Sequence, residues 1–275
     1  MTEPRDAAAQ GNAAPYGLRR PTAAPLPVVV SIPHTGTWMP QSVRAALASP
    51  AMQAQPMTDW HLHRLYEFLP ALGATTIFAT VSRFVVDLNR PPRPRPLYPG
   101  RFETGLVPLE TFHGEPVFAT PPDAAEVEAR RLAWHAPYHA QLAALLEEMR
   151  TRFGRVVLLD AHSVASVPNR LHGALRDEIY LGDRDGRSCG PWLRELLQGA
   201  FAAEGFRVAL NAPYKGGYIT DHYGAEPGVE ALQIEMAQRV YMDEDDPAGG
   251  PDHPRFAAAQ QQLLRVFRVL AAAIS

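Results

Sequence analysis

Cysteine is almost absent, since Cys189 is the single one in 275 residues. This excludes an intrachain disulfide and a zinc site built from several thiolates. A chain that uses so little cysteine is typical of a reducing compartment, and we expect a cytoplasmic protein. Lysine is equally scarce, because Lys215 is the only lysine among 26 basic residues.

An excess of positive charge is also missing. The 26 basic residues face 29 acidic ones, which gives a net charge of -3. A protein that neutralises a row of phosphates needs the opposite balance, so nucleic acid is not an expected partner. The longest uncharged stretch, residues 21–43, contains five prolines and cannot span a bilayer as a helix, and the first twenty residues lack an apolar signal core. We therefore expect no membrane partner.

What the sequence does have is an alternation of apolar strand patterns with amphipathic helix patterns. It predicts one α/β domain over residues 15–275, with a central mixed, largely parallel sheet flanked by helices, after a disordered tail at residues 1–14. The expected strands are residues 26–32, 74–80, 84–87, 155–160, 178–181, 206–210 and 228–236. The expected helices are residues 58–69, 123–152 with a kink at Pro137, 191–204 and 254–273.

Ligand-type side chains gather where the predicted strands end. In an open α/β sheet, ligands bind beyond the carboxyl ends of the strands. His34 follows the first strand and His162 follows the strand at 155–160, so the two histidines could face one metal ion. Hydrolytic zinc sites use three protein ligands and leave the fourth position to water. The residues alone leave three candidates for a carboxylate ligand: Asp59, in the first turn of a predicted helix, Asp87 and Asp160.

Two further residue types suggest catalysis. Glu235 lies between Ile234 and Met236 in a predicted strand whose alternation also places Gln233 on the same face. A carboxylate desolvated in this way has a raised pKa and can act as a general base, although a buried salt bridge with an arginine is the alternative. Arg83 and Arg90 flank the predicted strand 84–87 and could grip a carboxylate or stabilise an oxyanion, unless they are surface arginines.

Other motifs carry less. Residues 214–218 form a glycine-hinged loop that suggests a lid or a substrate loop. His135 and His139 have the spacing of a helical zinc pair, but no Glu accompanies them and Pro137 disturbs the turn, so we interpret both as structural. His61 and His63 are two residues apart on a predicted helix and should point to different faces rather than share a metal.

Seven ordered motifs resemble the N-formylglutamate amidohydrolase family. They span roughly residues 27–242 and read VVVSIPHTG, TDWHLHRLY, SRFVVDLNR, PYHAQL, LLDAHSVAS, YKGGYITDHYG and ALQIEMAQRVYM. The resemblance implies an α/β fold similar to that of zinc carboxypeptidases and aspartoacylase. It also implies hydrolysis of N-formyl-L-glutamate to formate and L-glutamate, as in histidine degradation.

The same resemblance implies roles for individual residues. It makes His34 and His162 ligands of one zinc per chain and favours Asp59 as the third ligand. Arg83 would face the developing oxyanion and Glu235 would be the base. Asn89 and Arg90 would hold a carboxylate of a small N-acyl amino acid substrate.

The chain departs from the family pattern in one loop. Where the family usually reads NGRFKGGYITRHYG, this chain reads NAPYKGGYITDHYG, so Pro213 and Asp221 replace two arginines. Lys215 is the cation left in that loop to contact the second carboxylate of N-formylglutamate. The departure keeps two alternatives open: a zinc amidohydrolase for another N-acyl amino acid, and a noncatalytic carboxylate-binding protein that retains the pocket. An oligomer is compatible with the sequence.

Overall fold

The computed structural model describes residues 13–274, so the first twelve residues of the expected tail lie outside the described part. One seven-stranded sheet forms its centre, in the order β1-β3-β2-β4-β7-β5-β6. The pairs β2-β3, β2-β4, β4-β7 and β5-β6 are parallel, whereas β1-β3 and β5-β7 are antiparallel. The predicted mixed, largely parallel sheet is thereby confirmed. The strands are β1 (Gly17–Arg19), β2 (Val28–Ile32), β3 (Thr75–Phe78), β4 (Val156–Val164), β5 (Ile179–Gly182), β6 (Val208–Leu210) and β7 (Val229–Ala237).

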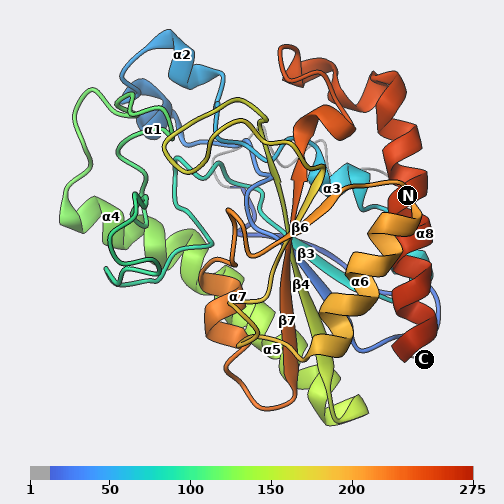
Figure 1. Cartoon of the computed structure of the whole chain (residues 1–275). Helices are drawn as coiled ribbons and strands as arrows, with labels where there is room; N and C mark the ends of the chain where they lie inside the picture. The colour runs from blue at the N-terminus through green and yellow to red at the C-terminus, as the bar shows by residue number, and fades with distance from the viewer. Residues whose placement is uncertain (1–12, 275) are drawn as a thin grey trace.

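Helices cover both faces of the sheet, because its central strands are apolar on both faces. α6 (Pro191–Ala203) and α8 (Pro254–Ile274) pack on one face, and α5 (Ala136–Phe153) packs on the other (Figure 1). The valines of β2 alternate between the two resulting cores, with Val28 in the first and Val29 in the second. The other helices are α1 (Gln41–Ala45), α2 (Pro50–Gln53), α3 (Leu62–Leu65), α4 (Ala124–Arg130) and α7 (Tyr218–Tyr223).

The predicted strand at residues 84–87 is wrong. This segment is a turn in which the Val85 N–H donates to the Ser82 carbonyl at 2.9 Å. Phe84, Val85 and Val86 are all buried, so the apolar run reflects burial in a compact turn rather than a place in the sheet. Such a short run cannot be assigned by its periodicity alone.

The predicted helix at residues 58–69 is mostly absent. The structure keeps one α-turn, α3, and a 3-10 turn at Leu69–Leu72. His61 adopts a left-handed conformation with φ of 59°, which prevents the helix from beginning earlier. Asp59 therefore lies before the helix rather than in its first turn, and its carboxylate is free to face the sheet.

The predicted long helix is nearly continuous from α4 to α5, joined by a π-helical turn at Arg131–His135. Proline lacks the N–H that an α-helix needs, and Pro137 is the second residue of α5, which begins where this turn ends. The irregularity expected at Pro137 is thus taken up just before it. β4 is longer than predicted, because it continues to Val164 and so contains His162. α7 is a helix that the sequence did not predict, and it begins at Tyr218, the last residue of the predicted glycine-hinged loop.

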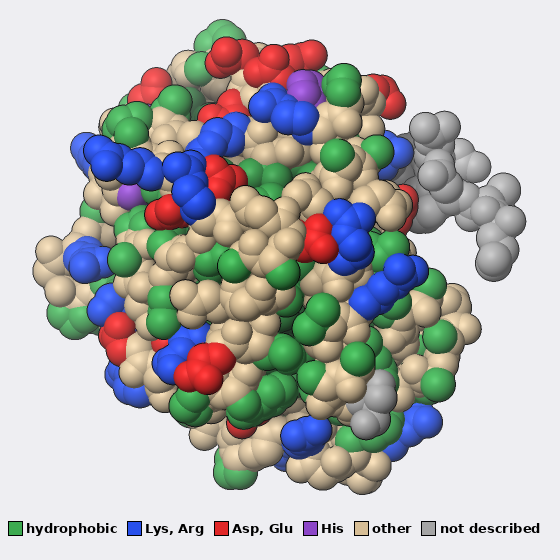
Figure 2. All heavy atoms as spheres, turned by 45° about the vertical axis from the view of Figure 1, so that its right-hand side comes forward, with side chains coloured by type: hydrophobic (Ala, Val, Ile, Leu, Met, Phe, Trp, Pro, Cys, Tyr) green, Lys and Arg blue, Asp and Glu red, His purple; other side chains and the backbone are tan. Residues whose placement is uncertain are grey.

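The surface carries charges of both signs. On the face shown in Figure 2, basic side chains are interspersed with acidic ones. Among the described residues, no helix combines the length and the hydrophobicity that crossing a membrane requires.

Candidate metal centre and active-site cavity

One cavity of about 630 Å³ brings the predicted site residues together. It lies at the carboxyl ends of β2, β4 and β7, which is where ligands bind in an open α/β sheet. Its lining includes every one of them: His34, Asp59, Arg83, Asn89, Arg90, His162, Lys215 and Glu235.

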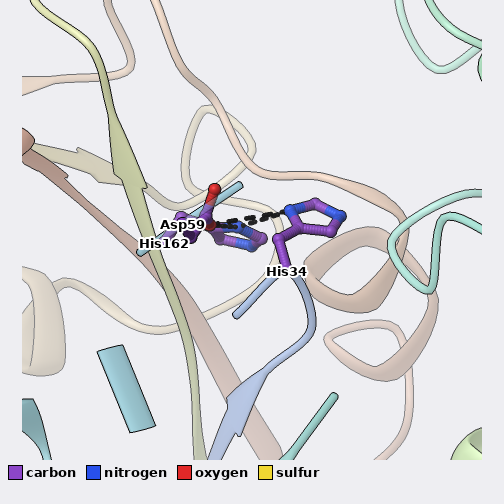
Figure 3. Close-up of side chains that lie close together, drawn as sticks. All are labelled: His34, Asp59 and His162. Carbon is purple, nitrogen blue, oxygen red and sulfur yellow. Dashed lines mark hydrogen bonds and ion pairs between the residues drawn. The ribbon is translucent and has the colours of Figure 1, made fainter. Parts of the chain in front are cut away.

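Two histidines and one carboxylate converge at the base of this cavity (Figure 3). The Nδ1 atoms of His34 and His162 lie 3.1 Å apart. Asp59 Oδ2 lies 3.0 Å from the Nδ1 atom of His162 and 3.6 Å from that of His34. All three side chains are buried. These are separations that ligand atoms of one tetrahedral ion show, since zinc lies about 2.0–2.2 Å from each nitrogen or oxygen ligand.

The local backbone explains this convergence. His34 stands two residues after the end of β2, and its carbonyl accepts the Asp59 N–H at 3.1 Å. The Asp59 carboxylate in turn accepts the Ser163 N–H at 3.2 Å. The irregular segment before α3 is therefore held against both strand ends, which places the carboxylate between the two imidazoles.

The other two candidate carboxylates lie on the far sides of the imidazoles. His34 Nε2 bonds to Asp87 Oδ1 at 2.6 Å, and His162 Nε2 contacts Asp160 Oδ2 at 3.1 Å. The contact with Asp87 directs the Nδ1 atom of His34 toward Asp59, as in carboxylate–histidine–metal arrangements. His162 Nε2 lies 2.9 Å from Asn89 Nδ2 as well as beside Asp160, and its Nδ1 atom lies 3.0 Å from Asp59 Oδ2. This donor set fits a divalent cation and favours Asp59 as its carboxylate ligand.

Without a metal, a proton takes the place between the same groups. Burial opposes charge on His162, but Asp160 and Asp59 raise its pKa well above the ordinary value. Burial likewise opposes charge on Asp59, yet its hydrogen bonds with His162 and His34 lower its pKa. A metal ion and a proton would therefore compete for this site, so metal binding should release protons.

Arg83 lines the same cavity as His34, Asp59 and His162. Its Nη2 donates to Asp87 Oδ2 at 2.7 Å and its Nη1 donates to the Met57 carbonyl at 3.2 Å. Its buried Nε has no hydrogen-bond partner in the described part of the chain. Burial would raise the pKa of Asp87, but Arg83 and His34 hold it well below the usual range. Arg83 is thus a fixed cation with one unused donor in the wall of the cavity.

Glu235 is 7% exposed, which confirms the expected desolvation. Burial raises its pKa to about 8, and Asp59 adds to this while His162 opposes it. Its Oε2 accepts a hydrogen bond from Gln233 Nε2 at 2.8 Å. Within residues 13–274 it forms no ion pair with an arginine, so the alternative of a buried salt bridge is wrong.

The residues expected to hold the substrate differ in how free they are. Asn89 Nδ2 donates to Asp160 Oδ2 at 2.9 Å, and Asn89 Oδ1 accepts the Ile219 N–H at 2.8 Å. Arg90 donates from Nε and Nη1 to backbone carbonyls at 2.9 Å each. Lys215 Nζ forms a half-exposed ion pair with Asp185 at 2.9 Å. The Asn89 side chain is therefore committed to the protein, whereas Arg90 Nη2 donates to no acceptor within residues 13–274.

Asp221, one of the two departures from the family pattern, has a structural role. Its carboxylate pairs with Arg184 at 2.8 Å and with Arg95 at 2.7 Å. Arg95 belongs to the proline-rich segment 91–103, several residues of which line the cavity. The hydroxyl of Tyr98 in this segment also bonds to the Gly216 carbonyl. Asp221 therefore helps to fasten segment 91–103 beside the cavity.

The remaining predicted histidine roles agree with the structure. His135 Nε2 bonds to the Arg90 carbonyl at 2.9 Å and His139 Nε2 bonds to the Leu88 carbonyl at 2.8 Å, so this pair is structural, as predicted. His61 bonds to the Pro247 carbonyl at 2.7 Å and His63 contacts Thr35 Oγ1 at 2.9 Å. The two histidines therefore contact different residues and do not form one site.

Sequence reasoning missed several contributors. Asp87 and Asp160, two of the three candidate carboxylate ligands, lie beside the Nε2 atoms of His34 and His162 and outside the group formed by His34, Asp59 and His162. Gln233 was placed on the correct face of its strand without a role. Nothing in the sequence indicated that the Tyr214 hydroxyl would be buried in the cavity wall without a partner among the described residues.

Comparisons with known proteins agree with this geometry. Residues 26–242 match the sequence profile described as N-formylglutamate amidohydrolase. The chain is 43% identical over 229 residues to an N-formylglutamate deformylase of Pseudomonas putida, with 81% of this chain and 84% of that protein covered. The corresponding enzyme of Pseudomonas aeruginosa is 44% identical over 228 residues, with the same coverage. The crystal structure of an N-formylglutamate amidohydrolase from Ralstonia eutropha JMP134 superimposes with a TM-score of 0.79 at 30% identity, covering 95% of this chain and 98% of that one. The chain belongs to the N-formylglutamate amidohydrolase family.

Proposed function

We propose that this chain is a zinc-dependent amidohydrolase that converts N-formyl-L-glutamate and water to formate and L-glutamate, in the cytoplasm and in the service of histidine degradation. The observation that carries the proposal is the convergence of His34, Asp59 and His162 beside the desolvated Glu235 in one cavity. The two Pseudomonas relatives, both named N-formylglutamate deformylase, support the choice of substrate.

One zinc per chain would be held by His34 Nδ1, His162 Nδ1 and Asp59. When bound there, zinc supplies Lewis-acid chemistry, which activates water and polarises a carbonyl. With zinc bound, Asp87 and Asp160 would accept the Nε2–H groups of the two imidazoles and so favour the tautomer that presents Nδ1 to the ion.

Glu235 would move the protons of the reaction. As the water oxygen bonds to the formyl carbon, one water proton passes to the Glu235 carboxylate. The same proton then passes to the amide nitrogen as the C–N bond breaks, so that formate and the free amine of glutamate leave. The raised pKa of Glu235 suits a group that must accept and return a proton near neutral pH.

Arg83 and Arg90 would hold the substrate. Arg83, which lines the cavity and keeps an unpartnered Nε–H, would supply the fixed positive charge for the negative charge that develops on the formyl oxygen. Arg90 Nη2 would grip the α-carboxylate, and the Asn89 backbone carbonyl, which accepts a hydrogen bond from Arg90 Nη1, would help to hold the guanidinium. Lys215 would leave its ion pair with Asp185 and bind the second carboxylate of the substrate instead.

A second candidate is an amidohydrolase for a different N-acyl amino acid. It is favoured by one observation, namely that Asp221 pairs with Arg184 and Arg95 and so neutralises cations near the mouth of the cavity. The metal and the base would act as described. The side-chain carboxylate of N-formylglutamate would be bound less favourably than in a more basic site.

Metal analysis together with formate release tests both candidates. Purified protein is expected to contain about one zinc per chain and to release formate from N-formylglutamate faster than from N-formyl-leucine or N-formyl-methionine. Faster turnover of the uncharged substrates would favour the second candidate. Absence of turnover in a zinc-loaded sample would leave a noncatalytic carboxylate-binding protein.

A further inference from the structure

A buried carboxamide connects the loop before α7 to the proposed base. Gln233 lies two residues before Glu235 on β7, so their side chains share one face of the strand. Its Oε1 accepts the Gly217 N–H at 2.8 Å, and its Nε2 donates to Glu235 Oε2 at 2.8 Å. The Gln233 side chain is 5% exposed, so water competes little for either hydrogen bond.

The backbone fixes which way this amide points. A backbone N–H can only donate, so the Gln233 atom facing Gly217 must be the oxygen. The NH₂ group must then face Glu235. Asn89 has the same arrangement one step away: its oxygen accepts the Ile219 N–H, and its NH₂ donates to Asp160. Gly217, the N-cap of α7, and Ile219, its second residue, thus orient two carboxamides, and each carboxamide donates to a carboxylate of the site.

The hydrogen bond makes the two oxygens of Glu235 unequal. Oε2 is held by an N–H donor and is a poor place for a second proton. Oε1 makes no hydrogen bond within the described part of the chain and belongs to a cavity-lining side chain. A proton taken from water would therefore go to Oε1.

We propose that Gln233 is a positioning residue that holds Glu235 by Oε2, so that Oε1 alone faces the attacking water. This inference rests on the proposed function, because it takes Glu235 as the base. It also links the loop at residues 214–217 to the base. Displacement of Gly217 would release the side-chain amide of Gln233 and, with it, the carboxylate of Glu235.

Several charged groups surround Glu235 and must stay constant in a test. His162 and Asp160 face Glu235 from β4. Asp59 approaches from the segment before α3, and Arg83 approaches from the turn that precedes Asp87. Tyr180 is its cross-strand partner on β5, and Tyr214 lines the same cavity. A substitution at residue 233 leaves all of these side chains in place.

The test compares two variants with a matched control. Gln233→Met keeps the length of the side chain and removes both hydrogen bonds, whereas Gln233→Glu keeps the shape but cannot donate unless it carries a proton. Gln55→Met is the control, because Gln55 is similarly buried at 6% exposure and bonds to the Thr37 carbonyl outside the cavity. Formate release from N-formylglutamate gives kcat and KM as a function of pH, and metal analysis and melting temperature check folding.

Gln233→Met is expected to lower kcat about 10- to 100-fold with KM within about twofold of the unmodified value. The acid limb of its pH profile should move to higher pH by about one unit, because the lost donor stabilised the carboxylate. Gln233→Glu should move the acid limb further in the same direction, since two carboxylates would then share a proton. Gln55→Met should match the unmodified protein in kcat and in the pH profile.

The inference is overturned if Gln233→Met raises KM at unchanged kcat, which would make Gln233 a substrate contact, or if neither variant moves the acid limb. If Gln233→Met does not fold, the near-isosteric Gln233→Glu decides alone by the same criterion. Failure of the proposed function looks different, because the unmodified, zinc-loaded protein would then release no formate.

Discussion

Both ring nitrogens of His34 and of His162 have hydrogen-bond partners, and this determines how the site should respond to single substitutions. A ligand or base in such a network cannot be replaced by a similar residue without leaving a buried group unpaired. Conservative substitutions are therefore informative here, because they keep the shape and change one chemical property.

Glu235→Gln keeps the shape of the proposed base and removes its ability to accept a proton. We expect zinc content to stay near one per chain while kcat falls about 10²- to 10⁴-fold. Metal analysis and formate release on the same sample check this. Near-normal turnover would show that Glu235 is structural.

The same substitution predicts a pH-dependent difference in stability of the metal-free protein. The folded-state pKa of Glu235 is raised to about 8, whereas the unfolded value is about 4.3. Between these values the folded protein binds the extra proton, so the contribution of Glu235 to stability decreases as pH rises, by up to about 1.4 kcal/mol per pH unit. Urea unfolding of the chelated protein from pH 5 to pH 8 should show a shallower decline for Glu235→Gln. Parallel curves would mean that the pKa is not raised.

At the scale of elements, α7 is short but its first turn is packed very closely against the site. A Cβ added at Gly217 would lie 2.4 Å from Asn89 Nδ2, so even a methyl group requires displacement of Asn89. The φ of Gly217 is -88°, which any residue can adopt, so space rather than backbone conformation requires the glycine.

Gly217→Ala is therefore expected to destabilise the protein by about 1–3 kcal/mol, as overpacking commonly does, and to lower kcat because Asn89 bonds to Asp160. Thermal unfolding and formate release measure the two effects. Gly199→Ala is a control of opposite sign: Gly199 lies in α6 with no atom within 4 Å of an added Cβ, so alanine should stabilise that helix by up to about 1 kcal/mol. Equal stability of the two variants would contradict the tight junction at Gly217.

The elements also show what sequence can and cannot predict. β2, β4, β7, α6 and α8 follow from apolar runs and helical periodicity, and His34 and His162 follow from their place at strand ends. The turn at residues 84–87 was missed because burial produces the same apolar run as a strand. The loss of the helix at residues 58–69 depends on the left-handed conformation of His61. The ring of His61 is hydrogen-bonded to the backbone carbonyl of Pro247, 186 residues away. Such tertiary contacts override local propensity.

The hydrogen-bond partners of the site were beyond prediction for the same reason. Asp87 could be named as a ligand candidate, but only the fold shows that it lies at Nε2 of His34 and not at Nδ1. Gln233 shows the limit clearly, because alternation gave its face and the partner Gly217 comes from a loop.

At the scale of the whole molecule, the proposed ligands come from three separate parts of the chain, and a metal that binds them should stabilise the entire fold. We expect chelation to lower the melting temperature reversibly and to abolish formate release. The His162→Ala variant should show no further decrease on chelation, whereas His253→Ala, at the start of α8, should behave like the unmodified protein. A melting temperature that chelation leaves unchanged would contradict a metal site within the fold.

The parallel pairing of β4 with β7 places His162 directly opposite Glu235. A slip of one residue would place Ile234 or Met236 there and turn Glu235 to the other face of the sheet. Since the residues of both strands outside the site are mostly apolar on both faces, such a slipped chain would still bury most of its aliphatic residues and could remain soluble. Turnover therefore counts chains in the native register, and the specific activity recovered after refolding, rather than the soluble yield, measures how many molecules have completed folding correctly.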